Sequence, residues 1–283
     1  MRRFLLAFSF LQFWCVLGVG PASASVLIMH CKYANSNQVD PIVSPGIAPS
    51  AHMHDFFGNT GVDQNSTADS LLGNATTCRT SGDTAAYWFP QPVVNGVATV
   101  STGTMGEYWN GAKHGVATPP HGMTYVAGNG HAEAATDNPH LTWTCGDSSS
   151  TLGSPAPKDC TNASAGSKHV TAVLVFAPCW DGTTAFDSPA GISTSHFVYL
   201  DGSSCPSGYT RIARLVTHTH FLDPRTGGIM VNPYNADGSL ALSFSSGPYY
   251  TFHGDYLNSW NQPALDALIQ GCLNQSGVCP PHA

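Results

Sequence analysis

Short apolar segments interrupted by glycine and proline constrain the fold of this chain more than any other feature. The sequence contains 29 glycines and 20 prolines in 283 residues, and so many breakers favour short strands joined by turns. The strongest strand signal is at residues 170–178 (VTAVLVFAP), where continuous apolar and β-branched residues are typical of a strand buried on both faces. An Asn-Gly pair at residues 95–96 lies between two apolar segments and predicts a β-hairpin.

Convincing helical periodicity occurs in one stretch, residues 262–273. Its apolar residues recur at i, i+3, i+4 and i+7 and form one stripe: Leu265, Leu268, Ile269 and Cys272. Such a stripe is typical of a helix that packs one face on a core, and Pro263 is tolerated in the first turn. We therefore expect residues 25–283 to form one all-β domain, a sandwich or jelly roll with long loops and one C-terminal helix.

Residues 1–24 have the features of a secretory signal peptide. Two arginines precede an apolar run at residues 4–19, and Ala22-Ser23-Ala24 provides a small-residue cleavage site. The run is short for a membrane span, so we expect a secreted protein, extracellular or periplasmic, without a membrane span. The formal charge is −7 at pH 7. An acidic chain argues against nucleic-acid binding, because that function needs a basic surface.

The cysteines indicate a disulfide-bonded protein. One of the nine, Cys15, lies in the signal peptide, and the remaining eight allow up to four disulfides in an exported chain. The local candidates are Cys145 with Cys160 and Cys179 with Cys205. The sequence contains no paired C-x-x-C motif, which argues against a zinc site built from cysteines.

Two histidines near the start of the mature chain form the clearest chemical signal. His52 and His54 are two residues apart, so in an extended strand their side chains point to the same face. Imidazole is the commonest metal ligand, and a neighbouring carboxylate or carbonyl orients it through the second ring nitrogen. The same spacing also fits two histidines that are hydrogen-bonded in a loop.

Four segments resemble, in their order along the chain, the signature of one family: residues 52–59 (HMHDFFGN), 178–189 (PCWDG, then FDSP), 195–199 (SHFVY) and 252–260 (FHGDYLNSW). This family is DUF1996, a group of secreted fungal and bacterial proteins with no assigned role. The resemblance runs from about His52 to Cys272. It indicates which residues are of interest without indicating a reaction.

The resemblance supports a pool of four metal ligands: His52, His54, His196 and His253. Histidines brought together in this way bind Zn²⁺ or Cu²⁺ and leave an open position for water or substrate. Asp255 or Asp55 would then orient a ligand or act as the base. The candidates for catalysis are His253, Asp255 and Asp181. The competing interpretation is a buried polar network that holds the loops in place.

Aromatic residues beside carboxylates suggest a sugar-binding surface. Trp180 and Asp187 are the strongest candidates for substrate contacts, and Tyr87 and Trp88 are further stacking candidates. Each of these aromatic residues also fits a position in the core. A two-carboxylate glycosidase would use Asp181, Asp187 or Asp255, but the chain has only two glutamates.

A second H-x-H motif is formed by His218 and His220. It fits a polar strand edge or a separate metal site, and His121 and His131 are weaker candidates. The leading hypothesis is a secreted metal-dependent enzyme that acts on an extracellular polysaccharide or another polymer. The alternative is a non-catalytic module that binds carbohydrate or cell-wall polymer.

Overall fold

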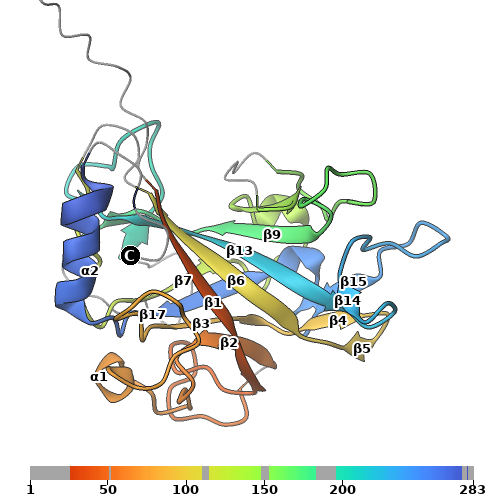
Figure 1. The fold of residues 1–283 in the computed structure, drawn as a ribbon, viewed down its shortest axis with the longest axis horizontal. Helices are drawn as coiled ribbons and strands as arrows, with labels where there is room; N and C mark the ends of the chain where they lie inside the picture. Colours follow the sequence, from red (N-terminus) through yellow and green to blue (C-terminus); the bar gives the residue numbers. More distant parts are fainter. Residues whose placement is uncertain are drawn as a thin grey trace, which may run out of the picture.

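An extended antiparallel sheet organises the protein. The computed structural model describes residues 26–50, 52–109, 115–147, 153–182, 196–275 and 279. The strand order is β7-β17-β3-β2-β1-β6-β13-β9-β8, and β14 pairs with β13 (Figure 1). The strands of this sheet are β1 (Val26–Asn37), β2 (His54–Gly58), β3 (Ala86–Pro90), β6 (Ser101–Trp109), β7 (Thr124–Gly128), β8 (Leu141–Cys145), β9 (Val170–Val175), β13 (Arg214–Asp223), β14 (Gly228–Ile229) and β17 (His253–Leu257).

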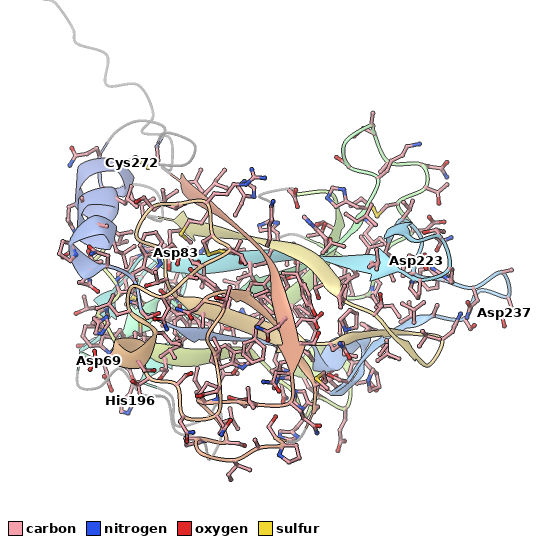
Figure 2. All side chains as sticks on the ribbon, turned by 60° about the horizontal axis from the view of Figure 1, so that its bottom comes forward. Asp69, Asp83, His196, Asp223, Asp237 and Cys272 are labelled. Atoms are coloured by element: carbon pink, nitrogen blue, oxygen red, sulfur yellow. A yellow bond between two sulfur atoms is a disulfide. The ribbon has the colours of Figure 1, made fainter. Side chains whose placement is uncertain are left out.

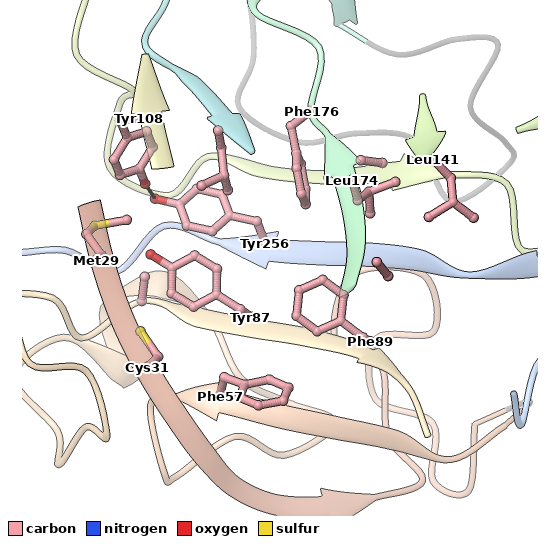
Figure 3. Close-up of a cluster of buried hydrophobic side chains, with 14 of the residues drawn as sticks. Met29, Cys31, Phe57, Tyr87, Phe89, Tyr108, Leu141, Leu174, Phe176 and Tyr256 are labelled. Atoms are coloured by element: carbon pink, nitrogen blue, oxygen red, sulfur yellow. Dashed lines mark hydrogen bonds between the residues drawn. The ribbon is translucent and has the colours of Figure 1, made fainter. Parts of the chain in front are cut away.

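The sheet curls so that its two ends face each other across the main core. Tyr125 of β7 and Phe176 after β9 pack edge to face with ring centroids 4.9 Å apart, although their strands lie near opposite ends of the order. A Cβ placed on Gly254 would lie 2.6 Å from Phe89 and 2.9 Å from Leu174. Glycine is therefore required where β17 approaches β9 most closely. Figure 3 shows part of this core, with Phe89 and Leu174 facing each other.

The all-β prediction is therefore confirmed, and one curled sheet supplies both layers of the sandwich. The apolar run at residues 170–178 does contain a buried strand, β9. On that strand, alternate residues enter the main core: Val170, Ala172 and Leu174.

A second apolar cluster covers the opposite face of β2, β3 and β17. It is formed by side chains of these strands, of the segment after β1 (Val39 and Ile42) and of the segment that contains helix α1 (Ala68–Leu71). Helix α1 is labelled in Figure 1. Phe56 stacks on Trp88 at the centre of this cluster, with ring centroids 5.5 Å apart. These three strands are thus buried on both faces, which explains why residues 86–90 (AYWFP) are apolar without alternation.

Two small sheets flank the main one. The first has the order β11-β10-β12, and the second has the order β16-β15-β4-β5. Their strands are β10 (Cys179–Trp180), β11 (Phe197–Val198), β12 (Thr210–Arg211), β4 (Pro92–Val94), β5 (Val97–Ala98), β15 (Leu242–Phe244) and β16 (Gly247–Pro248). Asn95 and Gly96 join β4 to β5 with φ angles of 50° and 78°, which confirms the predicted hairpin.

The C-terminal helix begins and ends as predicted. It consists of α2 (Gln262–Leu268) and a π-helical segment, η4 (Ile269–Leu273). The Asn261 side chain accepts a hydrogen bond from the Ala264 N–H and caps the first turn. The wider π turn changes the end of the predicted stripe, because Leu273 is buried there while Cys272 is only partly buried. Figure 2 shows Cys272 on this helix. Two single-turn 3₁₀ helices, η1 (Ala135–Asp137) and η3 (Tyr249–Thr251), complete the helical elements among the described residues.

Four disulfides join the eight cysteines outside the predicted signal peptide: Cys31–Cys78, Cys145–Cys160, Cys179–Cys205 and Cys272–Cys279. Both predicted local pairs are therefore confirmed. The predicted signal peptide lies outside the described residues. Within the part of the chain that is described, no helix has the length and apolar character needed to cross a membrane.

Candidate metal centre

Three of the four predicted imidazole ligands meet at one place. One ring nitrogen from each of His52, His54 and His253 lies within 4.8 Å of the other two. The Nε2 atoms of His52 and His253 are 3.2 Å apart, within hydrogen-bonding distance. The ring centroid of His54 lies 4.3 Å from that of His52 and 5.9 Å from that of His253. Residues separated by about 200 positions in sequence therefore form one cluster, which we call the imidazole triad.

Strand register explains why two of these side chains meet. His54 begins β2 and pairs with Pro90 of β3. On the other side of β3, Asp255 pairs with Trp88, so His253, two residues earlier, lies at the level of Pro90. His54 and His253 thus occupy the same row and the same face of the sheet. His52 joins them from the segment that leads into β2.

Backbone carbonyls fix the protonation of two of the rings. Nδ1–H of His54 donates to the Val39 carbonyl at 3.1 Å, and Nδ1–H of His253 donates to the Thr251 carbonyl at 2.9 Å. A carbonyl only accepts hydrogen bonds, so Nδ1 must carry the proton and Nε2 of the neutral ring keeps its lone pair. This is the arrangement by which proteins orient histidine ligands.

Burial keeps these rings neutral. It lowers the pKa of His253 to about 4, with a further contribution from the neighbouring His52. Burial also lowers the pKa of His54 well below its ordinary value, and it lowers the pKa of His52. Nε2 of His54 is buried and has no hydrogen-bond partner among the described residues. In the neutral triad Nε2–H of His52 donates to the Nε2 lone pair of His253, and the Nε2 lone pair of His54 is left without a partner, an arrangement in which a bound cation would replace the shared proton.

Two buried carboxyl groups lie next to His54. Asp40 and Asp255 each bring an oxygen within 4.8 Å of a ring nitrogen of His54 and of each other. Asp255 is 0% exposed, and neither of its oxygens has a hydrogen-bond partner among the described residues. Burial, and next to it the charge of Asp40, raises the pKa of Asp255 well above its ordinary value. An unpaired carboxyl at such a position is costly, and a cation would compensate for that cost.

Asp40 was not predicted as a site residue. Its Oδ1 accepts hydrogen bonds from the backbone N–H groups of Ile42 and Val43 at 3.0 and 2.9 Å. Burial raises the pKa of Asp40, and these hydrogen bonds partly offset the effect. The preceding residue, Val39, provides the carbonyl that orients His54. Because residues 38–50 have no regular periodicity, the only local signal at Asp40 is the Asp-Pro turn dipeptide.

Asp55 does not contribute to the imidazole triad, contrary to one of the alternatives considered above. It follows His54 directly in β2, so its side chain points to the opposite face. There it accepts hydrogen bonds from the Ser36 hydroxyl at 2.6 Å and from the Ser101 N–H at 2.7 Å. Burial raises the pKa of Asp55 to about 6 against the effect of these donors. Asp55 thus connects β2 to the segments beside it.

The loop after β7 closes over the triad. A Cβ placed on Gly130 would lie 3.0 Å from Nδ1 of His253, so the Gly130 backbone packs directly against that ring. His131, on the same loop, contributes to the lowered pKa of both His52 and His253 through its charge. His131 was only a weak candidate from sequence. The structure places it beside the triad.

Residues of this loop also line a cleft. It has a volume of about 650 Å³ and is lined by residues that include Asn129, His131, His140 and Tyr199. The rings of His140 and Tyr199 stack in parallel, with centroids 3.3 Å apart. The cleft therefore combines polar groups and ring faces next to the triad, as small-molecule and glycan sites commonly do.

His196 does not join the other three histidines, contrary to prediction. Nδ1 of His196 lies 2.6 Å from Oδ2 of Asp181. His196 directly precedes β11 and Asp181 directly follows β10, the strand with which β11 pairs. The local pairing of β10 with β11 fixes this position. His196 and Asp181 thus form a close side-chain contact beside the small sheet, where Trp180 is only partly buried. Asp187, the other predicted substrate contact there, lies outside the described residues.

Tyr87 and Trp88 belong to the core. Their exposed fractions are 2% and 0%, so neither offers a ring face to a ligand in this structure. They point to opposite faces of β3, because Tyr87 enters the main core and Trp88 enters the second cluster. Of the two interpretations of residues 86–90, core packing is the one that fits.

Comparisons with known proteins identify a family and no characterised relative. The family model described as a domain of unknown function, DUF1996, matches residues 40–260. This match contains all members of the imidazole triad and both neighbouring carboxyl groups. No curated protein and no solved structure matches the chain.

Proposed function

The chain belongs to the DUF1996 family, and we propose that it is an exported, metal-dependent enzyme that acts on an extracellular polysaccharide or a similar polymer. The observation that carries this proposal is the convergence of His52, His54 and His253. Backbone carbonyls hold the Nδ1–H groups of His54 and His253, so the Nε2 lone pair of each neutral ring is directed into the triad, where it could bind a metal. Such preorganisation is expected of ligands and is not needed in a packing residue.

The donor set supports one class of metal. Three neutral imidazoles favour Zn²⁺ or Cu²⁺ and leave a position for water or substrate. A metal of this kind acts as a Lewis acid and lowers the pKa of bound water toward neutrality. The buried carboxyl groups of Asp255 and Asp40 would balance the positive charge beside His54. Asp255 is also the candidate for orienting a ligand or for taking a proton from the reacting water.

The environment of the site supports an exported enzyme with a large substrate. Four disulfides fit an oxidising compartment outside the cytoplasm, in agreement with the predicted signal peptide. The cleft beside the triad has aromatic rings, amides and the carboxyl group of Asp137 on its walls, a combination that suits sugars, which need both stacking and hydrogen bonds. The competing wall-binding function loses two of its proposed stacking residues, because Tyr87 and Trp88 are buried.

The proposal is tested by product release from insoluble polysaccharides. Purified protein should release soluble sugars, lose this activity with EDTA, and regain it with Zn²⁺ or Cu²⁺. His253→Ala should be inactive, whereas His121→Ala should retain activity, because His121 pairs with Asp69 on the exposed surface. Activity that survives both EDTA and His253→Ala would contradict the proposal. Binding to the polymer without any release of products would favour the wall-binding module.

A further inference from the structure

A second group of potential metal ligands lies outside the imidazole triad. It consists of Asp147, His169 and His220, whose ligand atoms all lie within 4.8 Å of one another. Oδ1 of Asp147 is 2.5 Å from Nε2 of His220 and 3.7 Å from Nε2 of His169. The two rings are 4.6 Å apart and nearly perpendicular, at 76°. No residue of this group belongs to the triad or to the carboxyl pair beside it.

Three neighbouring strands bring these residues together. Asp147 follows β8, His169 precedes β9, and His220 lies on β13, where it pairs with Thr171. Between Asp147 and His169 the chain leaves the sheet and returns, and the Gly146 N–H donates to the His169 carbonyl at 2.9 Å. Gly146 has a φ of +75°, and a Cβ there would lie 2.8 Å from Ser167. Glycine is thus required for the turn that places Asp147.

A simple ion pair explains only part of this geometry. It accounts for the short contact between Asp147 and His220. It does not account for His169, whose Nε2 is buried and has no hydrogen-bond partner among the described residues. At 3.7 Å from Asp147, this nitrogen is too far away for a hydrogen bond. Two imidazoles directed at one carboxylate oxygen are the arrangement that a shared cation would organise.

The site is open enough to accept an ion from solvent. The Asp147 side chain is 37% exposed, and those of His169 and His220 are 15% and 16% exposed. Burial raises the pKa of the Asp147 carboxyl, but the neighbouring imidazoles of His169 and His220 outweigh this effect, so this pKa lies below its usual range. The carboxylate is therefore ionised at neutral pH. His218, the other histidine of this H-x-H motif, is fully buried and is not part of the group.

We propose that Asp147, His169 and His220 bind a second divalent cation, with Zn²⁺ as the best match to two imidazoles and one carboxylate. The ion joins the two ends of the excursion between β8 and β9, which the Cys145–Cys160 disulfide already shortens. Its role is structural. It stabilises the folded form because the ligands are far apart in the unfolded chain.

Zinc stoichiometry by native mass spectrometry separates this site from the triad. We expect two Zn²⁺ ions per wild-type chain, one in His253→Ala, and none in His253→Ala/His220→Ala. His253→Ala/His121→Ala serves as the matched control and should keep one ion. Zn²⁺ should raise the Tm of His253→Ala but not that of the His220 double variant.

Asp147→Asn in the His253→Ala background is a second test in case the His220→Ala substitution prevents folding. It removes a ligand while nearly preserving the shape of the side chain. It should also bind no zinc. A folded Asp147→Asn/His253→Ala or His220→Ala/His253→Ala protein that keeps one ion would overturn the proposal, as would a His253→Ala protein that binds none. If the wild type binds a single ion that is lost in His220→Ala and kept in His253→Ala, the second site stands and the triad does not bind zinc.

Discussion

Asp83 gives the sharpest prediction about stability. Its side chain is buried in the main core, and the residue is 0% exposed. Oδ1 accepts a hydrogen bond from the Ala85 N–H at 3.1 Å, and Oδ2 accepts one from the Tyr87 hydroxyl at 3.4 Å. These donors do not compensate for the loss of water, and burial raises the pKa of Asp83 to about 8. There is therefore a range of pH in which Asp83 is protonated in the folded protein but ionised in the unfolded chain.

The sign and size of the effect follow from this pKa difference. The ordinary pKa of 3.8 represents the unfolded chain, and the folded value is about 8. Between these values the folded protein holds one more proton, so the free energy of unfolding falls as pH rises, by about 1.4 kcal/mol per pH unit. The full contribution is present below pH 4 and is lost as the pH rises through 8. Across this window the loss amounts to about 6 kcal/mol, as an order of magnitude.

Asp83→Asn should remove this dependence. The amide keeps an oxygen for the Ala85 N–H and can donate to the Tyr87 hydroxyl, so the variant should resemble the wild type near pH 4. By pH 8 it should be more stable than the wild type by several kcal/mol. The measurement is urea unfolding from pH 4 to 9, with disulfides intact and EDTA present.

Asp266→Asn is the control, because Asp266 is exposed on α2. Its free energy of unfolding should change with pH in parallel with that of the wild type. If Asp83→Asn is destabilising by the same amount at every pH, the carboxyl is not protonated in the folded state and the reasoning is refuted.

Three other substitutions test the close packing and the site. Gly254→Ala places a Cβ 2.6 Å from Phe89 and should cost about 1–3 kcal/mol in urea unfolding. Gly130→Ala places a Cβ 3.0 Å from the His253 ring and should weaken zinc binding in calorimetric titration without removing any ligand. Asp255→Asn removes the carboxyl behind the triad and should lower zinc affinity by about 10–100-fold, the usual effect of losing a residue that supports metal ligands.

Two further glycines provide matched controls for these substitutions. A Cβ on Gly103 would lie 3.7 Å from the Cys31 carbonyl, an ordinary contact, and a Cβ on Gly271 would meet nothing within 4 Å. Gly103→Ala and Gly271→Ala should therefore leave stability and zinc binding close to those of the wild type. Equal effects at the control and test positions would show that the close approaches do not matter. Unchanged zinc affinity in Asp255→Asn would show that this carboxyl does not support metal binding.

Local sequence signals predicted the elements that local interactions determine. The apolar run of β9, the Asn95-Gly96 hairpin and the helix at residues 262–273 were found because strand, turn and helix periodicities are properties of short segments. The Cys145–Cys160 and Cys179–Cys205 disulfides were found because each joins cysteines close in sequence. The common face of His52 and His54 follows from a spacing of two residues.

Long-range register determined the rest of the candidate site. His253 joins His54 because β2 and β17 both pair with β3 at the level of Pro90. No short stretch of the sequence predicts this alignment. His196 belongs to an equally family-like motif, yet the pairing of β10 with β11 places it beside Asp181. Asp40 enters the site through an irregular loop. The group of Asp147 and His220 likewise depends on which strands are neighbours.

The most direct test of the metal centre is a crystal structure of zinc-soaked protein with anomalous data collected on both sides of the zinc edge. The account predicts an anomalous peak bonded to Nε2 of His52, His54 and His253 at about 2.0–2.1 Å, the usual zinc–nitrogen distance. Protein saturated with zinc in solution that shows no peak among these three imidazoles would contradict it.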